Sequence, residues 1–253
     1  MTSITPDVPP PTTLEQLLRR EDLWRGDSQR FAALRSVVGT GFDLLNAVLL
    51  GRGWPTGTLI EFCQDGWQAE CQLLLPALRE GTGLIVLLSP PATPFAQAFL
   101  QAGIDLDRVV VVEATDASTF LKSFVELSRA DACDAVLAWQ PKETLTYTQW
   151  RKCLLAASEG CGLYVAFRPG AHQQLNSPAS LRLHNHLVPS GLEVTVFKQK
   201  GQLKNVRPVT VELPVEWQEA TAYHLLDEGH SQRGTGRLAP RRLATVTPIR
   251  GQS

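Results

Sequence analysis

The dipeptide Gly-Lys is absent from all 253 residues of the sequence. Because that dipeptide supplies the phosphate-binding lysine of the common nucleotide-binding loop, its absence argues against a working loop of this type. The chain also lacks any apolar run close to the roughly 18 residues that a membrane-spanning helix needs. Its first residues, MTSITPDVPPPTT, lack the basic start and apolar centre of a secretion signal. We therefore expect a cytoplasmic protein with no membrane contact.

Strong net charge and metal-ligand motifs are missing as well. The formal charge is -1, so nucleic acid could be attracted only by a local basic cluster. The cysteines form no C-x-x-C pair and have mostly apolar neighbours, which favours reduced core residues; they are Cys63, Cys71, Cys133, Cys153 and Cys161. His184 and His186 lie two apart without nearby acidic or cysteine ligands, which favours a polar surface pair on a strand. We expect no metal and no cofactor.

Short apolar runs alternate with amphipathic segments along the middle of the chain. Runs of strand length occupy residues 58–62, 84–89, 108–113, 134–139 and 163–167. Their continuous hydrophobicity is typical of strands covered on both faces. Apolar spacings of three and four predict helices around residues 68–80, 93–102, 118–130 and 147–159. This alternation predicts an α/β fold with a mainly parallel sheet flanked by helices, and it places Leu59, Ile60, Leu84, Ile85, Val136 and Leu137 in central strands.

The end of this unit has a different pattern. LEVTVFKQKG (192–201) and VRPVTVELP (206–214) alternate in polarity around a basic turn, which predicts an antiparallel hairpin at one edge of the sheet. The chain then divides into an N-terminal segment with a short helix (1–38), a core domain (39–214) and a flexible basic tail (215–253).

The stretch GWPTGTLIEFCQDGWQAECQLLLPAL (53–78) predicts a buried strand, a short loop and a helix, the arrangement that holds phosphate in many nucleotide-binding proteins. The preceding VVGTGFDLLNAVLLGRGWPTGTLIEF resembles the entry to the core of the RecA recombinases. The resemblance runs from about Gly39 to Pro214 and implies a RecA-like core. It also implies that the loop is a degenerate phosphate loop, made of Gln64, Asp65, Gly66, Trp67, Gln68, Ala69, Glu70 and Cys71.

Carried onto matching positions, the resemblance places Glu70 where the family has its phosphate-binding lysine. Cys71 replaces the magnesium-binding hydroxyl, and Ala69 replaces the glycine before the lysine. The catalytic glutamate falls at Pro90 or Pro91, and the acid that ends a later strand falls at Trp139 or Gln140. We therefore expect no ATPase activity. Trp67 could fill the vacated site or form part of a contact surface, or it could be a half-buried loop residue.

Together with LWRG (23–26), SPPATPFAQAFLQAGIDLDRVVVV and the basic C-terminus, this pattern resembles the ImuA family, the RecA-related accessory proteins of damage-induced translesion synthesis. The resemblance implies a non-catalytic adaptor that binds ImuB, an inactive relative of the Y-family polymerases. Through that complex it would meet an error-prone replicative-type polymerase and link it to RecA or to DNA. Two alternatives stay open: a nucleotide-binding RecA-like regulator of recombination, and a SulA-like cell-division inhibitor.

Two basic regions are candidates for contact with DNA or a partner. The first combines the closing hairpin with the loop after residue 167 and contains Arg168, Lys198, Lys200, Lys204 and Arg207; it could contact phosphates or be a solvated turn. The second is the tail, which has no acidic residue after Glu228 and carries aliphatic side chains between its arginines. It predicts a segment that folds on binding through Arg233, Arg237, Leu238, Arg241, Arg242, Leu243, Val246 and Ile249.

Overall fold

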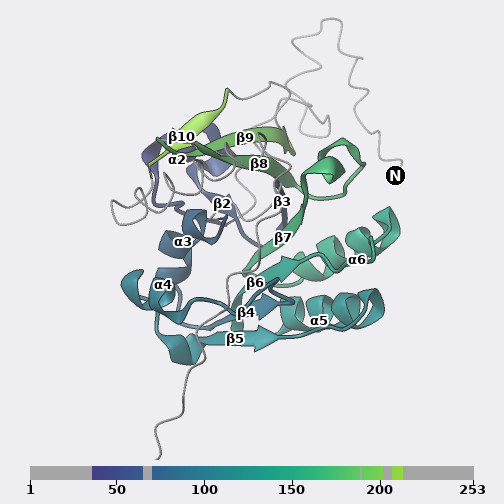
Figure 1. The fold of residues 1–253 in the computed structure, drawn as a ribbon. Coiled ribbons are helices and arrows are strands. Elements are labelled where there is room, and N and C mark those ends of the chain that lie inside the picture. The colour runs from purple at the N-terminus through teal and green to yellow at the C-terminus, as the bar shows by residue number, and fades with distance from the viewer. Residues whose placement is uncertain (1–35, 65–69, 189, 202–206, 213–253) are drawn as a thin grey trace, which may run out of the picture.

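The computed structural model describes residues 36–64, 70–188, 190–201 and 207–212 (Figure 1). In these ranges eight strands form one sheet in the order β10-β9-β8-β3-β7-β6-β4-β5. Their bounds are β3 Thr58–Gln64, β4 Leu84–Leu88, β5 Val109–Val112, β6 Cys133–Trp139, β7 Leu163–Pro169, β8 Leu181–Val188, β9 Gly191–Gln199 and β10 Val209–Val211. A separate antiparallel pair joins β1 (Val37–Val38) to β2 (Trp54–Pro55).

The sheet is parallel from β5 to β8 and antiparallel beyond it. β3 lies at its centre and pairs in parallel with β7 and β8, two strands that come more than 90 residues later in the chain. β9 then pairs antiparallel with both β8 and β10. The predicted α/β fold with a mainly parallel sheet and an antiparallel edge is confirmed.

The turn into β9 needs a glycine. Gly191 has φ of 142°, and a side chain there would meet the backbone oxygen of Val211. Because only glycine adopts this conformation readily, Gly191 allows the close approach of β10 at this end of the hairpin.

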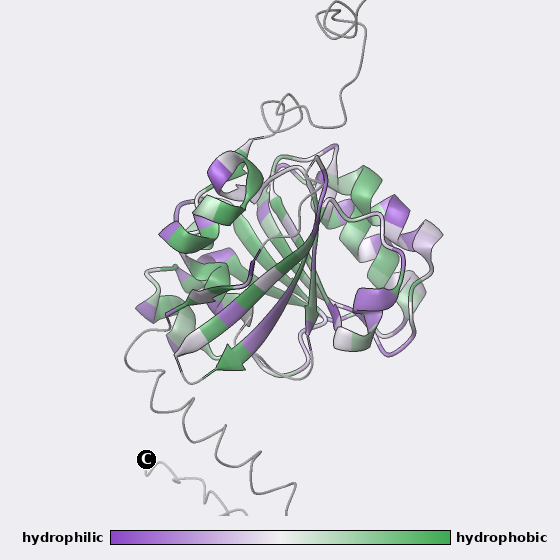
Figure 2. Cartoon of the chain, turned by 90° about the horizontal axis from the view of Figure 1, so that it is seen from above, coloured by the Kyte–Doolittle hydropathy of each residue, from purple (hydrophilic) through white to green (hydrophobic). Residues whose placement is uncertain are grey.

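Helices cover both faces of the sheet (Figures 1 and 2). Their bounds are α2 Asp43–Val48, α3 Leu75–Arg79, α4 Ala96–Gln101, α5 Ala117–Arg129 and α6 Tyr147–Ala157, with 3-10 turns η2 Leu50–Arg52, η3 Glu70–Leu73, η4 Leu106–Arg108 and η5 Gly170–Gln174. α5 begins where the Asp116 carboxylate accepts hydrogen bonds from the first-turn amides, and α6 begins with a capping box between Thr146 and Gln149. Within the described part of the chain, no helix has the length and apolarity to cross a membrane.

Each face of the sheet has its own apolar layer. One layer packs with α3 and α4 and contains Ile60, Ile85 and Leu137; the other packs with α5 and α6 and contains Leu59 and Val136. These five residues are at most 1% exposed, as the sequence predicts, whereas Leu84 is half-buried at the start of β4. Alternate residues of the central strands therefore serve opposite layers.

The expectation that every apolar run is covered on both faces is wrong for β5. Val110 and Val111 are 36% and 45% exposed because β5 is the outer strand and pairs only with β4. The N-terminal segment, with its expected helix at residues 14–21, and the tail lie outside the described residues.

Candidate functional site

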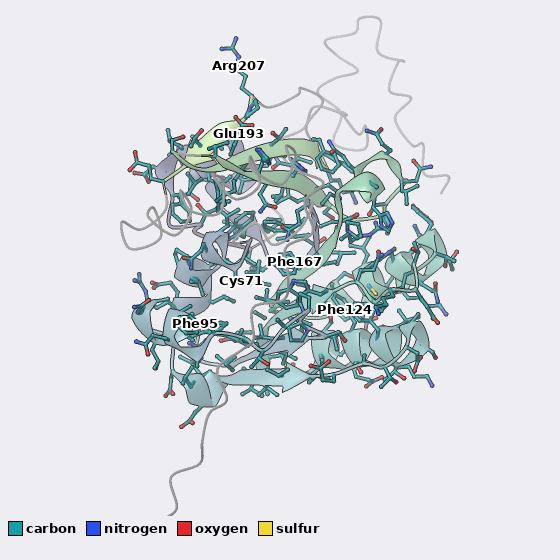
Figure 3. All side chains as sticks on the ribbon, viewed as in Figure 1. Cys71, Phe95, Phe124, Phe167, Glu193 and Arg207 are labelled. Atoms are coloured by element: carbon teal, nitrogen blue, oxygen red, sulfur yellow. The ribbon has the colours of Figure 1, made fainter. Side chains whose placement is uncertain are left out.

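The residues predicted to form a degenerate phosphate loop begin at the end of the central strand. β3 is buried along its whole length and ends at Gln64, and the chain resumes at Glu70, the first residue of η3. Where the sequence predicted one helix over about residues 68–80, the structure has the 3-10 turn η3 followed by the short helix α3. Five of the predicted loop residues lie outside the described residues: Asp65, Gly66, Trp67, Gln68 and Ala69. The interpretations of Trp67 therefore stay predictions. Cys71, on η3, is half-buried and packs against the same apolar layer as Phe62 and Phe167 (Figure 3).

Aromatic rings line the sheet face beside this connection. Trp139 ends β6 and stacks on Phe167 of β7, with ring centroids 4.6 Å apart and an angle of 28° between the planes. Phe167 contacts Phe62 of β3 at 5.4 Å, and Phe62 contacts Trp54 at 5.8 Å. Strand register explains the order, because Phe167 lies between Trp139 and Phe62 on neighbouring strands.

The aromatic row consists of Trp54, Phe62, Trp139 and Phe167. Trp139 and Gln140 are the two positions at which the resemblance expects an acid. The Trp139 indole packs on the apolar layer, and the Gln140 side-chain oxygen accepts a hydrogen bond from Arg168 Nε at 2.9 Å. Neither group carries the negative charge that Mg²⁺ ligands need.

A buried ionic cluster occupies the opposite face of the same strands. Glu61 of β3 is 1% exposed, and its carboxylate accepts hydrogen bonds from Arg168 of β7 and from Ser177. Arg182 of β8 lies opposite Glu61 in the strand register and donates from Nη2 to Glu61 Oε1 at 3.2 Å. Arg182 Nε is 3.2 Å from the other carboxylate oxygen, although it is not aligned for a hydrogen bond.

Further contacts fix both arginines. The Arg168 guanidinium lies 4.9 Å from the ring centre of Trp150, and that of Arg182 lies 4.8 Å from the ring centre of Phe197. Arg182 also donates to the backbone oxygen of His172 at 2.9 Å. Since a buried charge is stable only when paired and hydrogen-bonded, the cluster ties β3, β7, β8 and η5 together.

The cluster has more positive than negative charge, and titratable groups around it respond. The pKa of His172 is lowered by burial and by the nearby Arg168, whose Nη2 lies 3.2 Å from His172 Nδ1. Burial and the Arg182 charge lower the pKa of Lys198. Burial beside Glu61 raises the pKa of the Cys63 thiol to about 12. The local potential therefore disfavours any additional proton on His172 or Lys198.

The structure does not bring the predicted basic contact residues into one exposed strip. The Arg168 side chain is 2% exposed and already paired within the protein. Lys198 is half-buried and donates to the Ser177 backbone oxygen at 2.7 Å, whereas Arg207 is exposed. Lys200 is exposed just after the end of β9, and Lys204 lies outside the described residues, as does every predicted contact residue of the tail.

Sequence reasoning missed Glu61 and Arg182. A signal was present, because Glu61 is the single charged residue in TLIEFCQ, a run otherwise suited to a buried strand. A carboxylate at such a position requires a cationic partner from a neighbouring strand. The sequence alone did not identify that partner, since it comes from β7 and β8.

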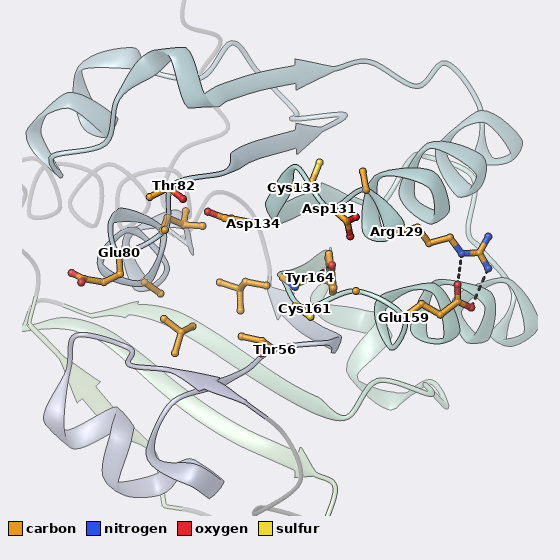
Figure 4. A pocket seen from close by; sticks show the side chains of 18 residues that line it. Thr56, Glu80, Thr82, Arg129, Asp131, Cys133, Asp134, Glu159, Cys161 and Tyr164 are labelled. Atoms are coloured by element: carbon orange, nitrogen blue, oxygen red, sulfur yellow. Dashed lines mark hydrogen bonds and ion pairs between the residues drawn. The ribbon is translucent and has the colours of Figure 1, made fainter.

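A cavity of about 530 Å³ opens at the other end of the parallel strands (Figure 4). Its lining includes Asp131, Asp134 and Tyr164, and the ion pair between Arg129 and Glu159, 2.6 Å at its shortest, lies at one side. Asp134 accepts from the Gly83 amide, and the Tyr164 hydroxyl donates to the Ser128 backbone oxygen at 2.8 Å. Because the cavity lies at the amino ends of β6 and β7, it is distinct from the phosphate-loop position, which follows the carboxyl end of β3.

Cysteines and histidines form no metal centre in the part of the chain that the structure describes. All five cysteines are free; Cys63, Cys133 and Cys153 are buried, as expected, but Cys161 is exposed. His184 and His186 lie on β8 with their rings stacked 6.4 Å apart, and His186 is exposed.

Fold and site together define a mostly parallel α/β protein with a row of aromatic rings beside the end of its central strand. No protein-family model matches the chain, and no curated protein is similar to it in sequence. Among solved structures, SulA from Pseudomonas aeruginosa is 24% identical over 44% of this chain and 98% of that chain, with a TM-score of 0.36. A likeness of that size carries no conclusion about function.

Proposed function

We propose that the protein is a non-catalytic adaptor of damage-induced translesion DNA synthesis, related to the ImuA proteins. In this function it binds an ImuB-type polymerase-like protein and links it, with an error-prone replicative-type polymerase, to RecA or to DNA. It works without ATP.

The aromatic row supports the non-catalytic half of this proposal. Nucleotide hydrolysis needs a magnesium site and a water-orienting acid at the carboxyl ends of the parallel strands. Here Trp139 is stacked on Phe167 at one such strand end, and Gln140 is engaged by Arg168. A site arranged in this way favours a surface for protein contact over chemistry.

The partner half rests on the sequence resemblance and on the charge of the tail. After Glu228 the chain carries five arginines and no acidic residue. Arginines interleaved with aliphatic side chains suit a segment that binds an acidic or phosphate-bearing surface and buries its aliphatic residues there. Arg207 and Lys200, close to the sheet edge, are further candidates for contact with DNA.

The test is an affinity measurement with a purified ImuB-type protein. We expect the full chain to bind it, a chain ending at Glu228 to lose most of that affinity, and binding to weaken as salt rises because exposed charges are screened. Equal affinity of both chains would move the interface to the core or to the N-terminal segment.

A control experiment distinguishes the adaptor function from the alternative function of a cell-division inhibitor. The same preparation is added to a tubulin-like division protein during its GTP-dependent assembly. The adaptor function predicts unchanged assembly. Inhibition of assembly, combined with no binding to the ImuB-type protein, would replace this proposal with the inhibitor function.

A further inference from the structure

The outer edge of β5 presents unpaired backbone groups. The Val112 backbone oxygen faces β4, where it accepts a hydrogen bond from the Ser89 amide at 2.8 Å. Since backbone groups alternate in direction along a strand, the C=O of Val109 and the N–H and C=O groups of Val111 and Glu113 face away from β4, while the Val109 N–H donates to the Leu106 backbone oxygen. No other described strand pairs with β5.

This edge lacks the usual protection against strand addition. β5 consists of four valines, pairs with β4 without a bulge, and leaves Val110 and Val111 exposed. Proteins normally guard such an edge with lysine, proline, a bulge or a covering segment. β5 has no lysine, proline or bulge, so a covering segment is the remaining way to protect its edge.

The charges around β5 indicate what kind of segment fits. Asp105 and Asp107 are exposed just before the strand, and Glu113 is exposed just after it. The basic residue that directly precedes β5, Arg108, turns inward and donates to the backbone oxygens of Gly83 and Leu78. A covering strand should therefore have apolar or β-branched residues in its middle and a cation at each end.

We propose that residues 241–250 of the same chain, RRLATVTPIR, add to β5 as a ninth strand of the sheet. Their middle, LATVTPI, is rich in residues that suit strands, and Arg241, Arg242 and Arg250 flank it on both sides. Arg242 and Arg250 lie on either side of this middle, as the acidic residues Asp107 and Glu113 lie on either side of β5.

Pro248 sets the register of the added strand. Proline has no N–H, so it fits an edge strand only where its nitrogen faces solvent. By alternation, Ala244 and Val246 then also face outward, while Leu243, Thr245, Thr247 and Ile249 direct their backbone groups toward β5. Pro248 would also block further strand addition.

Geometry permits this contact within one molecule. β5 and β10 lie at opposite edges of the sheet, about 34 Å apart for eight strands. The 31 residues from Glu212 to Leu243 can span up to about 100 Å.

The inference does not depend on the proposed function. It adds one consequence to the proposed function. The tail would use the same residues to dock on β5 and to bind a partner, so the two contacts would compete. Docking would hold the tail until a partner with higher affinity removes it.

Hydrogen exchange of the isolated full chain tests the contact through the outward-facing amides of Val111 and Glu113. We expect these amides to exchange about tenfold faster in Thr245→Pro, which removes an N–H directed at β5. The matched control is Val246→Pro, whose N–H faces away and which should keep the wild-type rate. Equal exchange in all three proteins would overturn the proposal and leave the edge open to a strand from another protein.

A second experiment reverses the charges on the tail and then those beside β5. Arg242→Glu with Arg250→Glu should also speed exchange, and Asp107→Lys with Glu113→Lys added in the same chain should restore protection. Protection that grows with protein concentration would show that a second molecule supplies the strand, and would overturn the claim that the chain covers its own edge. No partner protein is present, so failure here is independent of the adaptor test.

Discussion

Glu61 is the residue on which three elements depend. Its carboxylate accepts from Arg168, Arg182 and Ser177 in a site that is 1% exposed. Glu61→Gln keeps the shape but leaves two buried guanidinium groups without a counter-charge, and we expect a loss of about 3 to 5 kcal/mol in the free energy of unfolding. Urea denaturation measures it.

The matched control is Glu159→Gln, which breaks the exposed pair with Arg129 and should change stability little. Similar losses in the two variants would mean that the buried cluster has no special role in stability.

His172 makes stability depend on pH. Its pKa is lowered in the folded protein by burial and by Arg168. The unfolded chain therefore binds a proton more readily than the folded protein as the pH falls through the ordinary histidine range, so stability should fall there. Thermal melts at pH 7.5 and 5.5 should show a lower melting temperature at acid pH, and a smaller difference in His172→Gln. The same difference in both proteins would assign the effect to other groups.

At the scale of elements, nucleotide binding is the property to measure. With Trp139 stacked on Phe167 and no lysine in the phosphate connection, we expect no dissociation constant below about 1 mM for ATP with magnesium, near -4 kcal/mol. Calorimetric titration checks this, with an active P-loop ATPase in the same buffer as control. A micromolar constant would favour the nucleotide-binding regulator.

Strands with continuous apolar runs were predictable, and β8 was not. LRLHNHLV carries Arg182, two histidines and Asn185, so it suggested a polar strand surface and gave no sign of a central place in the sheet. The partners that allow Arg182 to be buried come from neighbouring strands, because Glu61 of β3 and Phe197 of β9 contact its guanidinium. Polarity that is neutralised by a distant element cannot be read from local pattern.

The candidate site was also predictable only in part. Replacement of the acid by Trp139 or Gln140 followed from position alone, whereas the stacking on Phe167 depends on the register of β6 and β7. Arg168 was expected on a surface because its loop is polar. Its burial follows from a carboxylate 107 residues earlier in the chain.

At the scale of the whole molecule, thiols report the integrity of the fold. Burial raises the pKa of Cys153 to about 12, and that of Cys63 likewise, while Cys161 is exposed. With a thiol reagent at neutral pH, Cys161 should react first, and Cys63 and Cys153 should react only as the protein unfolds. Cys161→Ser should remove the fastest phase. Rapid modification of Cys153 in native protein would show that the α6 layer opens easily.

The central place of β3 also has a consequence for synthesis on the ribosome. β3 is made early, yet the arginines that neutralise Glu61 follow 107 and 121 residues later. At about 5 to 20 residues per second, the strand waits roughly 5 to 25 seconds for them. During that interval a highly apolar strand and an uncompensated carboxylate are exposed to the cell, so the nascent chain should depend on chaperones until β7 and β8 emerge.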